Sequence, residues 1–362
     1  MLMLKDTVMK TLIVGAGPTG LSAALQLASH GLSCRIVEQR TKASELSRAI
    51  GITPSTIDAL RPLGAADAII MEAMHLQKVD LYWGKKRLMQ LDIGASGFKD
   101  QMILGLPQDR TEEILRETLA AKGVEVEYGV SVENIATDES TATVTFSDGT
   151  TESHDWVVAA DGIHSKCRKS LGIGYPGYDL PEVWSIADVD LAEDFDSDRV
   201  NIQLHGRSGS VVITLPMEKH RVRVVSATPD ALAALSAPLP IINIRRTATF
   251  TISVRQAESY VRGRVLLAGD AAHCHSPVGG RGMNLGIADA VAAGKAIAEG
   301  TVPEYSDARH REGKRILQKT EAARKLITSH APWNKALVYA AAMAINSLPP
   351  ARNAFLRSLT QL

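Results

Sequence analysis

The sequence has few cysteines and no excess of charge of either sign. Its 362 residues include three cysteines, Cys34, Cys167 and Cys274, with no CxxC pair among them. This number and spacing argue against a disulfide framework and a zinc site, and they favour a reducing compartment, so we expect a cytoplasmic protein. The 40 Lys and Arg balance the 40 Asp and Glu. Nucleic acid is therefore not expected as a partner, because a phosphate backbone requires a basic face.

Aromatic residues and long apolar runs are also scarce. Aromatic residues make up 4% of the chain, which disfavours a stacking platform for single strands. The best apolar run, over 336–348, is shorter than the about 18 residues of a membrane span, so none is expected. Hydrophobic residues reach 45% and charged residues 22%, a balance typical of a folded globular protein. The length predicts two domains, or one large domain with an insertion.

The first chemical motif is a glycine-rich turn between a predicted strand and a predicted helix. The apolar run 11–14 leads into Gly15-Ala16-Gly17-Pro18-Thr19-Gly20, and a helical pattern follows as far as residue 31. Glycines at this spacing allow a pyrophosphate to approach the helix N-terminus closely. A second apolar strand ends at Glu38, whose carboxylate can accept hydrogen bonds from adenosine ribose hydroxyls. The pattern predicts a bound dinucleotide but does not separate FAD from NAD. The acidic Glu38 disfavours a cofactor with a 2′-phosphate on its ribose, but the nearby Arg40 keeps such a cofactor possible.

The order of the other predicted elements indicates a discontinuous domain. Lys85 and Lys86 follow Gly84 in a hairpin pattern, Asp148-Gly149 marks a tight turn, and a helix capped by a threonine is predicted over 111–122. Strands dominate from about 183 to 255, a buried strand returns near 264, and helices are predicted over 283–298 and from 305 onward. The αβ core is therefore interrupted by a β insertion.

We accordingly expect an α/β fold with a three-layer Rossmann-like dinucleotide-binding domain, an inserted, mostly antiparallel β-sheet domain and C-terminal helices. The expected ranges are 1–75, 100–180 and 256–304 for the first, 76–99 and 181–255 for the second, and 305–362 for the helices. The basic, apolar tail has two interpretations, a helical cap on the core or a surface for a membrane or partner.

Two further motifs identify the family. Residues 161–168 read DGIHSKCR, and residues 264–273 read RVLLAGDAAH, followed by PVGGRGMN over 277–284. Together with GAGPTG they resemble the three fingerprints of the FAD-dependent aromatic hydroxylases, the family of p-hydroxybenzoate hydroxylase, in the family's order and spacing. The resemblance runs from about residue 10 to 330 and is weakest between 180 and 255. Arg281 departs from it, since many relatives carry Gln there.

The resemblance implies FAD as the cofactor and NADPH or NADH as a transient reductant. It implies that Pro277 lies beside the isoalloxazine and that Asp270 holds a ribityl hydroxyl. Glycines that open a helix can also turn their N–H groups toward the flavin's pyrimidine edge. The residues expected to contact the cofactor are Gly15, Ala16, Gly17, Pro18, Thr19, Gly20, Glu38, Gln39, Arg40, Arg48, Gln108, Val130, Asp161, Gly162, Gly269, Asp270, Pro277, Gly280, Gly282, Met283 and Asn284. For Asp161 a purely structural role, capping its own turn, stays open.

The implied reaction is hydroxylation of an aromatic or polycyclic phenolic small molecule. In such a reaction NAD(P)H reduces FAD, O2 adds to the reduced flavin, and the C4a-hydroperoxide transfers oxygen to the ring. Two alternatives share the fold: a flavin-dependent halogenase or geranylgeranyl-reductase-like enzyme, and a non-catalytic FAD-binding protein. The halogenase pattern WxWxIP is absent, the nearest string being Trp184-Ser185-Ile186. A monomer and a homodimer are both compatible with the sequence.

The substrate is expected between the inserted sheet and the flavin. Strand alternation puts Val212 and Thr214 on one face, and Arg221 and Arg223 share a face of the next strand. These four and Tyr82 are candidate lining residues, with a solvated strand face as the alternative for the arginines. His205 is a candidate general base on weak grounds, and Pro277 is the other candidate catalytic position. His273 and His275 lack a third ligand, so no metal is expected.

Overall fold

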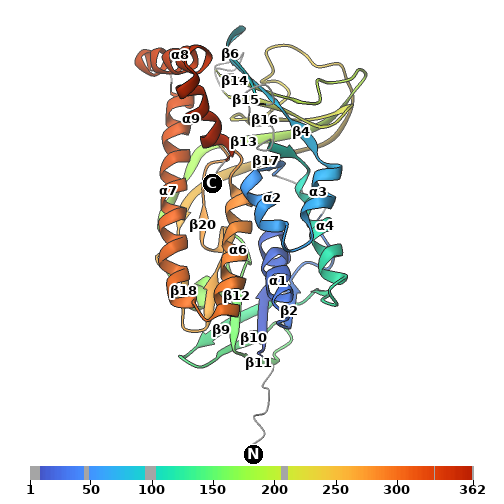
Figure 1. The fold of residues 1–362 in the computed structure, drawn as a ribbon, viewed down its shortest axis with the longest axis vertical. Helices are drawn as coiled ribbons and strands as arrows, with labels where there is room; N and C mark the ends of the chain where they lie inside the picture. The colour runs from blue at the N-terminus through green and yellow to red at the C-terminus, as the bar shows by residue number, and fades with distance from the viewer. Residues whose placement is uncertain (1–8, 45–48, 94–102, 205–210, 330, 361–362) are drawn as a thin grey trace, which may run out of the picture.

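The computed structural model describes residues 9–44, 49–93, 103–204, 211–329 and 331–360 (Figure 1). Two residues singled out in the sequence, Arg48 and His205, lie outside the described residues.

A six-stranded sheet forms the centre of one part of the molecule, with the strand order β18-β19-β12-β1-β2-β8. All its neighbouring pairs are parallel except β18 with β19. Its strands are β1 (Thr11–Val14), β2 (Cys34–Glu38), β8 (Val126–Tyr128), β12 (Trp156–Ala159), β18 (Val261–Arg262) and β19 (Val265–Leu267). The central strands β1 and β19 are buried along their whole length, as expected for parallel strands that are covered on both faces.

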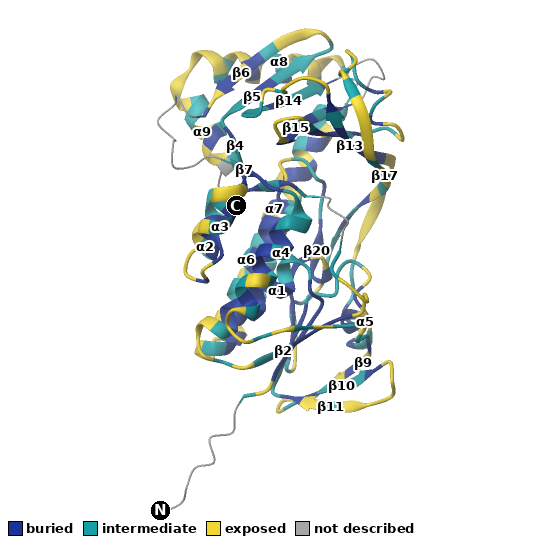
Figure 2. Ribbon diagram, turned by 90° about the vertical axis from the view of Figure 1, so that its right-hand side faces the viewer, coloured by how far each residue is buried: buried dark blue, intermediate teal, exposed yellow. Residues whose placement is uncertain are grey.

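Helices and a small sheet cover this parallel sheet and share its hydrophobic core. The helices are α1 (Pro18–Ser29), α4 (Gln108–Ala120) and α6 (Gly282–Glu299), which stand side by side in Figure 2. The small antiparallel sheet consists of β9 (Val132–Thr137), β10 (Ala142–Phe146) and β11 (Thr151–His154) and lies at the lower end of the molecule (Figure 2). The three-layer α/β prediction is confirmed.

An eight-stranded, mostly antiparallel sheet forms the other end of the molecule, with the order β20-β17-β13-β16-β15-β14-β5-β6. Only β14 and β5 pair in parallel. Its strands are β5 (Lys78–Trp83), β6 (Lys86–Asp92), β13 (Gly177–Leu191), β14 (Arg199–Leu204), β15 (Val212–Glu218), β16 (Arg221–Ser226), β17 (Ile241–Gln256) and β20 (His273–Cys274). The long strands β13 and β17 run from this end toward the parallel sheet (Figure 1).

The two faces of the eight-stranded sheet have different cover. Register puts Val212, Val224 and Ala187 on one face, where they pack with residues of the 231–239 segment. The opposite face carries Ile213 and Leu215 and packs against apolar residues of the C-terminal helices.

Short elements and the C-terminal helices complete the chain. The short elements are β3 (Gly51–Ile52), α2 (Pro54–Leu60), α3 (Ala66–Glu72), β4 (Met74–Leu76), β7 (Ile103–Gly105), α5 (Lys166–Ser170) and the 3-10 helix η3 (Gly269–Ala271). The last helices are α7 (Val302–Thr328), α8 (Pro332–Ser347) and α9 (Pro349–Thr360), and α7 runs along most of the molecule (Figure 1). Within the described ranges, no helix combines the length and hydropathy needed to cross a bilayer.

Two predicted turns and one predicted helix start can be compared with the structure. The hairpin at Gly84 and the turn at Asp148-Gly149 are confirmed, the latter with Gly149 at φ +83°. The helix predicted over 111–122 instead begins at Gln108, with Pro107 as N-cap. Thr111 lies inside the helix, and its hydroxyl donates to the carbonyl oxygen of Pro107 at 3.2 Å. The prediction of a threonine cap was wrong because a helical threonine can satisfy its hydroxyl on the preceding turn.

Candidate functional site

The turn between β1 and α1 leaves the N-terminus of α1 accessible to an anion. Gly15 has φ +102°, and a Cβ on Gly20 would lie 1.8 Å from the carbonyl oxygen of Gly15, so the turn requires glycine at both positions. A Cβ on Gly17 would meet no protein atom within 4 Å. The helix has no side-chain N-cap, and Pro18 occupies its first turn. Uncapped backbone N–H groups and open space at Gly17 suit a pyrophosphate.

The side chain of Thr19 marks the point where three segments meet. A Cβ built on Gly269 or on Gly286 would lie 2.5 Å from Oγ1 of Thr19. Glycine at both positions therefore lets the turn after β1, the turn after β19 and the first half of α6 lie side by side. Motifs that are 250 residues apart in sequence thus form one site.

Glu38 at the end of β2 is held in place by hydrogen bonds. Its Oε2 accepts the backbone N–H of Ala16 at 2.9 Å, and its Oε1 accepts the backbone N–H and the Nε–H of Arg40. Burial raises the pKa of Glu38, but the hydrogen bonds from Arg40 and Ala16 outweigh this effect and lower it. The carboxylate is thus ionised and oriented beside the turn, as an acceptor of ribose hydroxyls must be. Gln39 is exposed, and the N–H of Val130 donates to the carbonyl oxygen of Glu38.

A second carboxyl, on Glu112, lies near this end of β2 and was not predicted from the sequence. Gln108 donates from Nε2 to Oε1 of Glu112 at 2.8 Å, while its own Oε1 accepts the backbone N–H of Ala49 at 3.3 Å. Burial raises the pKa of Glu112 to about 7, against the lowering effects of Gln108 and the Arg40 charge. Nothing in the helical spacing of α4 distinguishes this glutamate from its exposed neighbours, so only the fold could reveal it.

We expect Glu112 to make the flavin-free protein less stable as the pH rises. The folded-state pKa of about 7 lies above the ordinary value of 4.5, so the stabilisation is full below pH 4.5 and is lost as the pH rises through 7. This difference between the two pKa values corresponds to a change of roughly 3 kcal/mol in the free energy of unfolding. Urea unfolding between pH 4.5 and 8 should show this fall in the native chain and not in Glu112→Gln. Glu113→Gln, at a half-exposed neighbour, is the control, and equal pH slopes for the native chain and Glu112→Gln would refute the assignment.

The segment 161–168 builds a cap and a tie to the turn after β19. Asp161 accepts the hydroxyl of Ser165 at 2.6 Å and the backbone N–H of Cys167 at 3.1 Å. Arg168 is buried and donates to the carbonyl oxygens of Ala271 and Ile163 at 2.9 and 3.0 Å. The carboxylate of Asp161 therefore orders its own turn, which is the structural role left open in the sequence, and Gly162 follows it at φ +78°.

Asp270 and Asp289 have contrasting environments at the turn after β19. Asp270 is exposed, directly after the buried Gly269. Asp289 of α6 is fully buried. Its Oδ2 accepts the backbone N–H of Gly269 at 3.1 Å and lies 2.5 Å from Nε2 of His273. Its Oδ1 accepts the Nε–H of Arg309 at 2.6 Å. Burial raises the pKa of Asp289, but the charges of His273 and Arg309 reverse this effect and lower it. The buried carboxylate thus joins this turn to α6 and α7, while Asp270 faces outward.

The two histidines of this segment do not form a metal site. His273 contacts Asp289, and Nδ1 of His275 lies 2.8 Å from the carbonyl oxygen of Ser276. Burial lowers the pKa of His275 to about 4, which keeps its ring neutral at physiological pH. Among the described residues, no group of three or more His, Cys, Asp or Glu side chains could hold a metal ion.

The loop before α6 presents exposed backbone. Gly279 and Gly280 have φ +86° and +62°, the Gly280 N–H donates to the carbonyl oxygen of Pro277, and α6 begins at Gly282 without a side-chain N-cap. Uncapped N–H groups at this helix end suit the electron-rich edge of a flavin. Arg281, however, is buried and donates from Nη2 to the carbonyl oxygen of Ser358 in α9, so its guanidinium engages the C-terminal helix.

Asn284 connects this loop to the segment after β3. Its Nδ2 donates to the carbonyl oxygens of Gly51 and Gly280 at 2.8 and 2.9 Å. Its Oδ1 accepts the N–H of Thr53 and the hydroxyl of Thr56 at 2.9 and 2.7 Å. The side chain of Asn284 therefore braces the loop, and the predicted contact of this residue with the cofactor stays a prediction. The adjacent Met283 belongs to the hydrophobic core.

Three of the predicted substrate-lining residues lie on the face of the eight-stranded sheet opposite to the predicted arginines. Register places Val212, Thr214 and Tyr82 opposite to the face of Arg223, and Val212 packs under the 231–239 segment. The face of Arg223 instead carries Ile213 and Leu215. Alternation along a strand defines two faces, but which one meets the rest of the protein depends on the covering segment.

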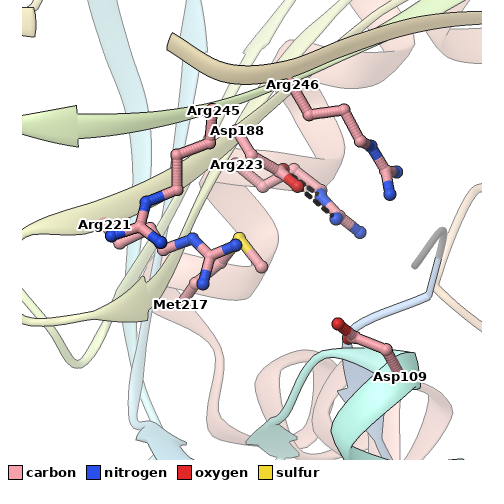
Figure 3. A pocket seen from close by; sticks show the side chains of 7 residues that line it. All are labelled: Asp109, Asp188, Met217, Arg221, Arg223, Arg245 and Arg246. Carbon is pink, nitrogen blue, oxygen red and sulfur yellow. Dashed lines mark hydrogen bonds and ion pairs between the residues drawn. The ribbon is translucent and has the colours of Figure 1, made fainter. Parts of the chain in front are cut away.

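Arginines on the other face line a cavity of about 400 Å³ together with an aspartate from α4 (Figure 3). The lining residues are Asp109, Asp188, Met217, Arg221, Arg223, Arg245 and Arg246. Arg223 is fully buried and pairs with Asp188 through two hydrogen bonds of 2.6 and 2.7 Å. Asp109 points from α4 toward the strands that carry the arginines. Arg221 and Arg223 thus meet as predicted. Arg245 and Arg246 of β17 join them at a bulge, where Arg246 pairs with Asp188 of β13, Ile244 pairs with Val189, and Arg245 is the extra residue between them.

The comparisons with known proteins agree on one family. A family model for the FAD binding domain matches residues 8–322. The chain is 31% identical over 349 residues to 6-methylpretetramide 4-monooxygenase of Streptomyces rimosus, covering 88% of this chain and 62% of that protein. It is 31% identical over 351 residues to pentachlorophenol 4-monooxygenase of Sphingobium chlorophenolicum, covering 88% and 65%. The chain thus spans just under two thirds of the length of these two curated relatives.

Solved structures share the fold. The p-nitrophenol 4-monooxygenase from Pseudomonas putida superposes with a TM-score of 0.86 at 23% identity, covering 98% of both chains. The anhydrotetracycline hydroxylase from Streptomyces rimosus gives a TM-score of 0.77 at 27% identity, covering 97% of this chain and 76% of that one.

Proposed function

Since the chain belongs to the FAD binding domain family, we propose that it is a FAD-dependent monooxygenase that hydroxylates an aromatic or polycyclic phenolic small molecule with NAD(P)H and O2. The observation that carries this proposal is the junction at Thr19, where the turn after β1, the turn after β19 and the start of α6 lie together. The names of the relatives support the substrate class, because 6-methylpretetramide and pentachlorophenol are aromatic compounds.

The residues of the first turn fit the adenosine half of FAD. The N-terminus of α1, with open space at Gly17, would hold the pyrophosphate, and Glu38 would accept the ribose hydroxyls. Val130, which hydrogen-bonds to Glu38 through its backbone, would border the adenine. Gln108, held between Ala49 and Glu112, would reach the middle of the cofactor.

The residues of the later motifs fit the flavin half. The exposed Asp270 would accept a ribityl hydroxyl, and the uncapped start of α6 after Gly280 would face the pyrimidine edge of the ring. When bound, FAD supplies electron transfer from NAD(P)H and the activation of O2. The chain's task is to orient the cofactor and substrate and to exclude water from the space between them.

We place the substrate ring between the start of α6 and the face of the sheet that carries Ile213 and Leu215. Both side chains belong to apolar clusters on this face, and Pro277, in the loop before α6, is the position proposed nearest to the reacting centre. In this arrangement the parallel sheet and its helices form the FAD-binding part, and the eight-stranded sheet forms the substrate-binding part. The choice between NADPH and NADH, a cytoplasmic location, and a monomeric or homodimeric state stay predictions.

The proposal is tested by purifying the full chain and measuring its flavin and its turnover. We expect a yellow protein that contains FAD and oxidises NAD(P)H faster when a suitable phenol is added, with one hydroxyl incorporated from O2. A protein that neither carries nor takes up FAD would overturn the proposal. FAD binding without substrate-stimulated oxidation across a broad phenol panel would favour a non-catalytic flavin protein, and a product formed only with chloride would indicate a halogenase.

A further inference from the structure

The arginine-lined cavity carries more positive charge than its own carboxylates neutralise. Four arginines line it but only two aspartates, Asp109 and Asp188. The whole chain, by contrast, has a net charge of zero. Two of the arginines are partly neutralised from outside the cavity, Arg245 by Asp190 and Arg221 by the exposed Glu218.

Hydrogen-bonding capacity is also left over at this cavity. The Nε of Arg221 is buried without a hydrogen-bond partner, although its Nη1 contacts Glu218 at 3.0 Å. On the opposite wall, Oδ1 of Asp109 is also buried without a hydrogen-bond partner. As an acceptor it would take a hydrogen bond from a donor group of a ligand and would not bind an anionic oxygen. Buried polar atoms normally have partners, so such atoms around one cavity indicate a ligand with polar atoms of its own.

The lining differs from that of a typical pocket for an aromatic ring. Met217 is the one lining residue with an apolar side chain, whereas pockets for aromatic ligands are lined mainly by apolar and aromatic side chains. Guanidinium groups present forked N–H donors that match phosphate and carboxylate oxygens. A volume of about 400 Å³ admits a small ligand or part of a larger one.

We propose that this cavity is a binding site for an oxyanion group of a small ligand, with Arg221 and Arg246 as its main donors. Arg223, held by Asp188, supplies a fixed positive charge at the base of the site. Two ligands carry this chemistry if the proposed function holds: the pyrophosphate of NAD(P)H, and an acidic substituent on the aromatic substrate.

Inorganic pyrophosphate is the probe for the site. Isothermal titration of the purified, flavin-loaded chain at low ionic strength should show binding that weakens roughly tenfold in Arg221→Gln and in Arg246→Gln, because each loses a charge-assisted hydrogen bond. Arg255→Gln is the matched control, since Arg255 lies on the same strand as Arg246 but pairs with Asp179 outside the cavity. The affinity of this variant for pyrophosphate should equal that of the native chain. Flavin content and thermal stability verify that each variant is folded.

Kinetics then identify the source of the anion. A rise in KM for NADPH or NADH in both variants assigns the site to the reductant. A rise in KM for an aromatic acid, but not for its neutral ester, assigns it to the substrate. Absence of pyrophosphate binding, or equal affinity in the native chain and both variants, overturns the proposal. Because the titration requires no turnover, it decides the anion site even if no phenol stimulates NAD(P)H oxidation.

Discussion

Replacing Gly17 by alanine should weaken the binding of FAD without changing the fold of the flavin-free chain. Gly17 has φ −76° and ψ −178°, a conformation open to alanine, and the added methyl group would meet no protein atom within 4 Å. The methyl group would instead occupy the space through which the pyrophosphate approaches the N-terminus of α1. Losing one charge-assisted hydrogen bond there raises the Kd for FAD roughly 10- to 100-fold.

Gly20→Ala is the informative comparison for this prediction. Its Cβ would lie 1.8 Å from the carbonyl oxygen of Gly15, so the turn itself must move, and both flavin binding and the stability of the flavin-free chain should fall. Fluorescence titration with FAD and thermal unfolding without FAD separate the two variants. If Gly17→Ala binds FAD with the native Kd, the pyrophosphate does not lie at this turn.

Of the substitutions considered for this protein, Asp289→Ala should lower the free energy of unfolding most. Its carboxylate is fully buried and interacts with His273, Arg309 and the backbone N–H of Gly269. Removing it leaves the guanidinium of Arg309, whose side chain is 17% exposed, without its ion-pair partner. Breaking a buried ion pair from one side costs about 3–5 kcal/mol, and we expect a loss of that size in the free energy of unfolding measured with urea.

Two further variants define what Asp289 contributes. Asp289→Asn keeps an acceptor for the Gly269 N–H but removes the charge, so its loss of stability should be smaller than that of the alanine variant. Glu299→Ala lies on the same helix and disrupts only an exposed 3.9 Å pair with Lys295, which should change stability by less than about 0.5 kcal/mol. Similar effects of Glu299→Ala and Asp289→Ala would show that the buried cluster contributes little.

Asp289 and Arg309 also explain why the C-terminal helices matter to the site. Arg309 lies on α7 and reaches Asp289 of α6, which in turn hydrogen-bonds to Gly269 beside Asp270. Arg281 makes a second link from the loop before α6 to Ser358 in α9. The helical tail is therefore part of the support of the candidate flavin site.

The local sequence pattern by itself was enough to predict the first strand, the glycine-rich turn, the helix that follows it and the second strand. The spacing of Gly15, Gly17 and Gly20 between an apolar strand and a helix depends on backbone sterics that act within a few residues, and so does the end of β2 at Glu38. The α/β class and the β insertion followed from the order of such local patterns. These predictions needed no knowledge of distant contacts.

Tertiary structure alone decided how the side chains of those elements are grouped. Strand alternation separates Val212 from Ile213 and Leu215, but only the packed chain shows that the 231–239 segment covers the face of Val212. The raised pKa of Glu112 arises from its burial in the folded chain. The grouping of Arg221 with Arg246 depends on strand register across the sheet. Burial, strand register and long-range pairing arise only when the chain is packed, so a local sequence pattern does not predict them.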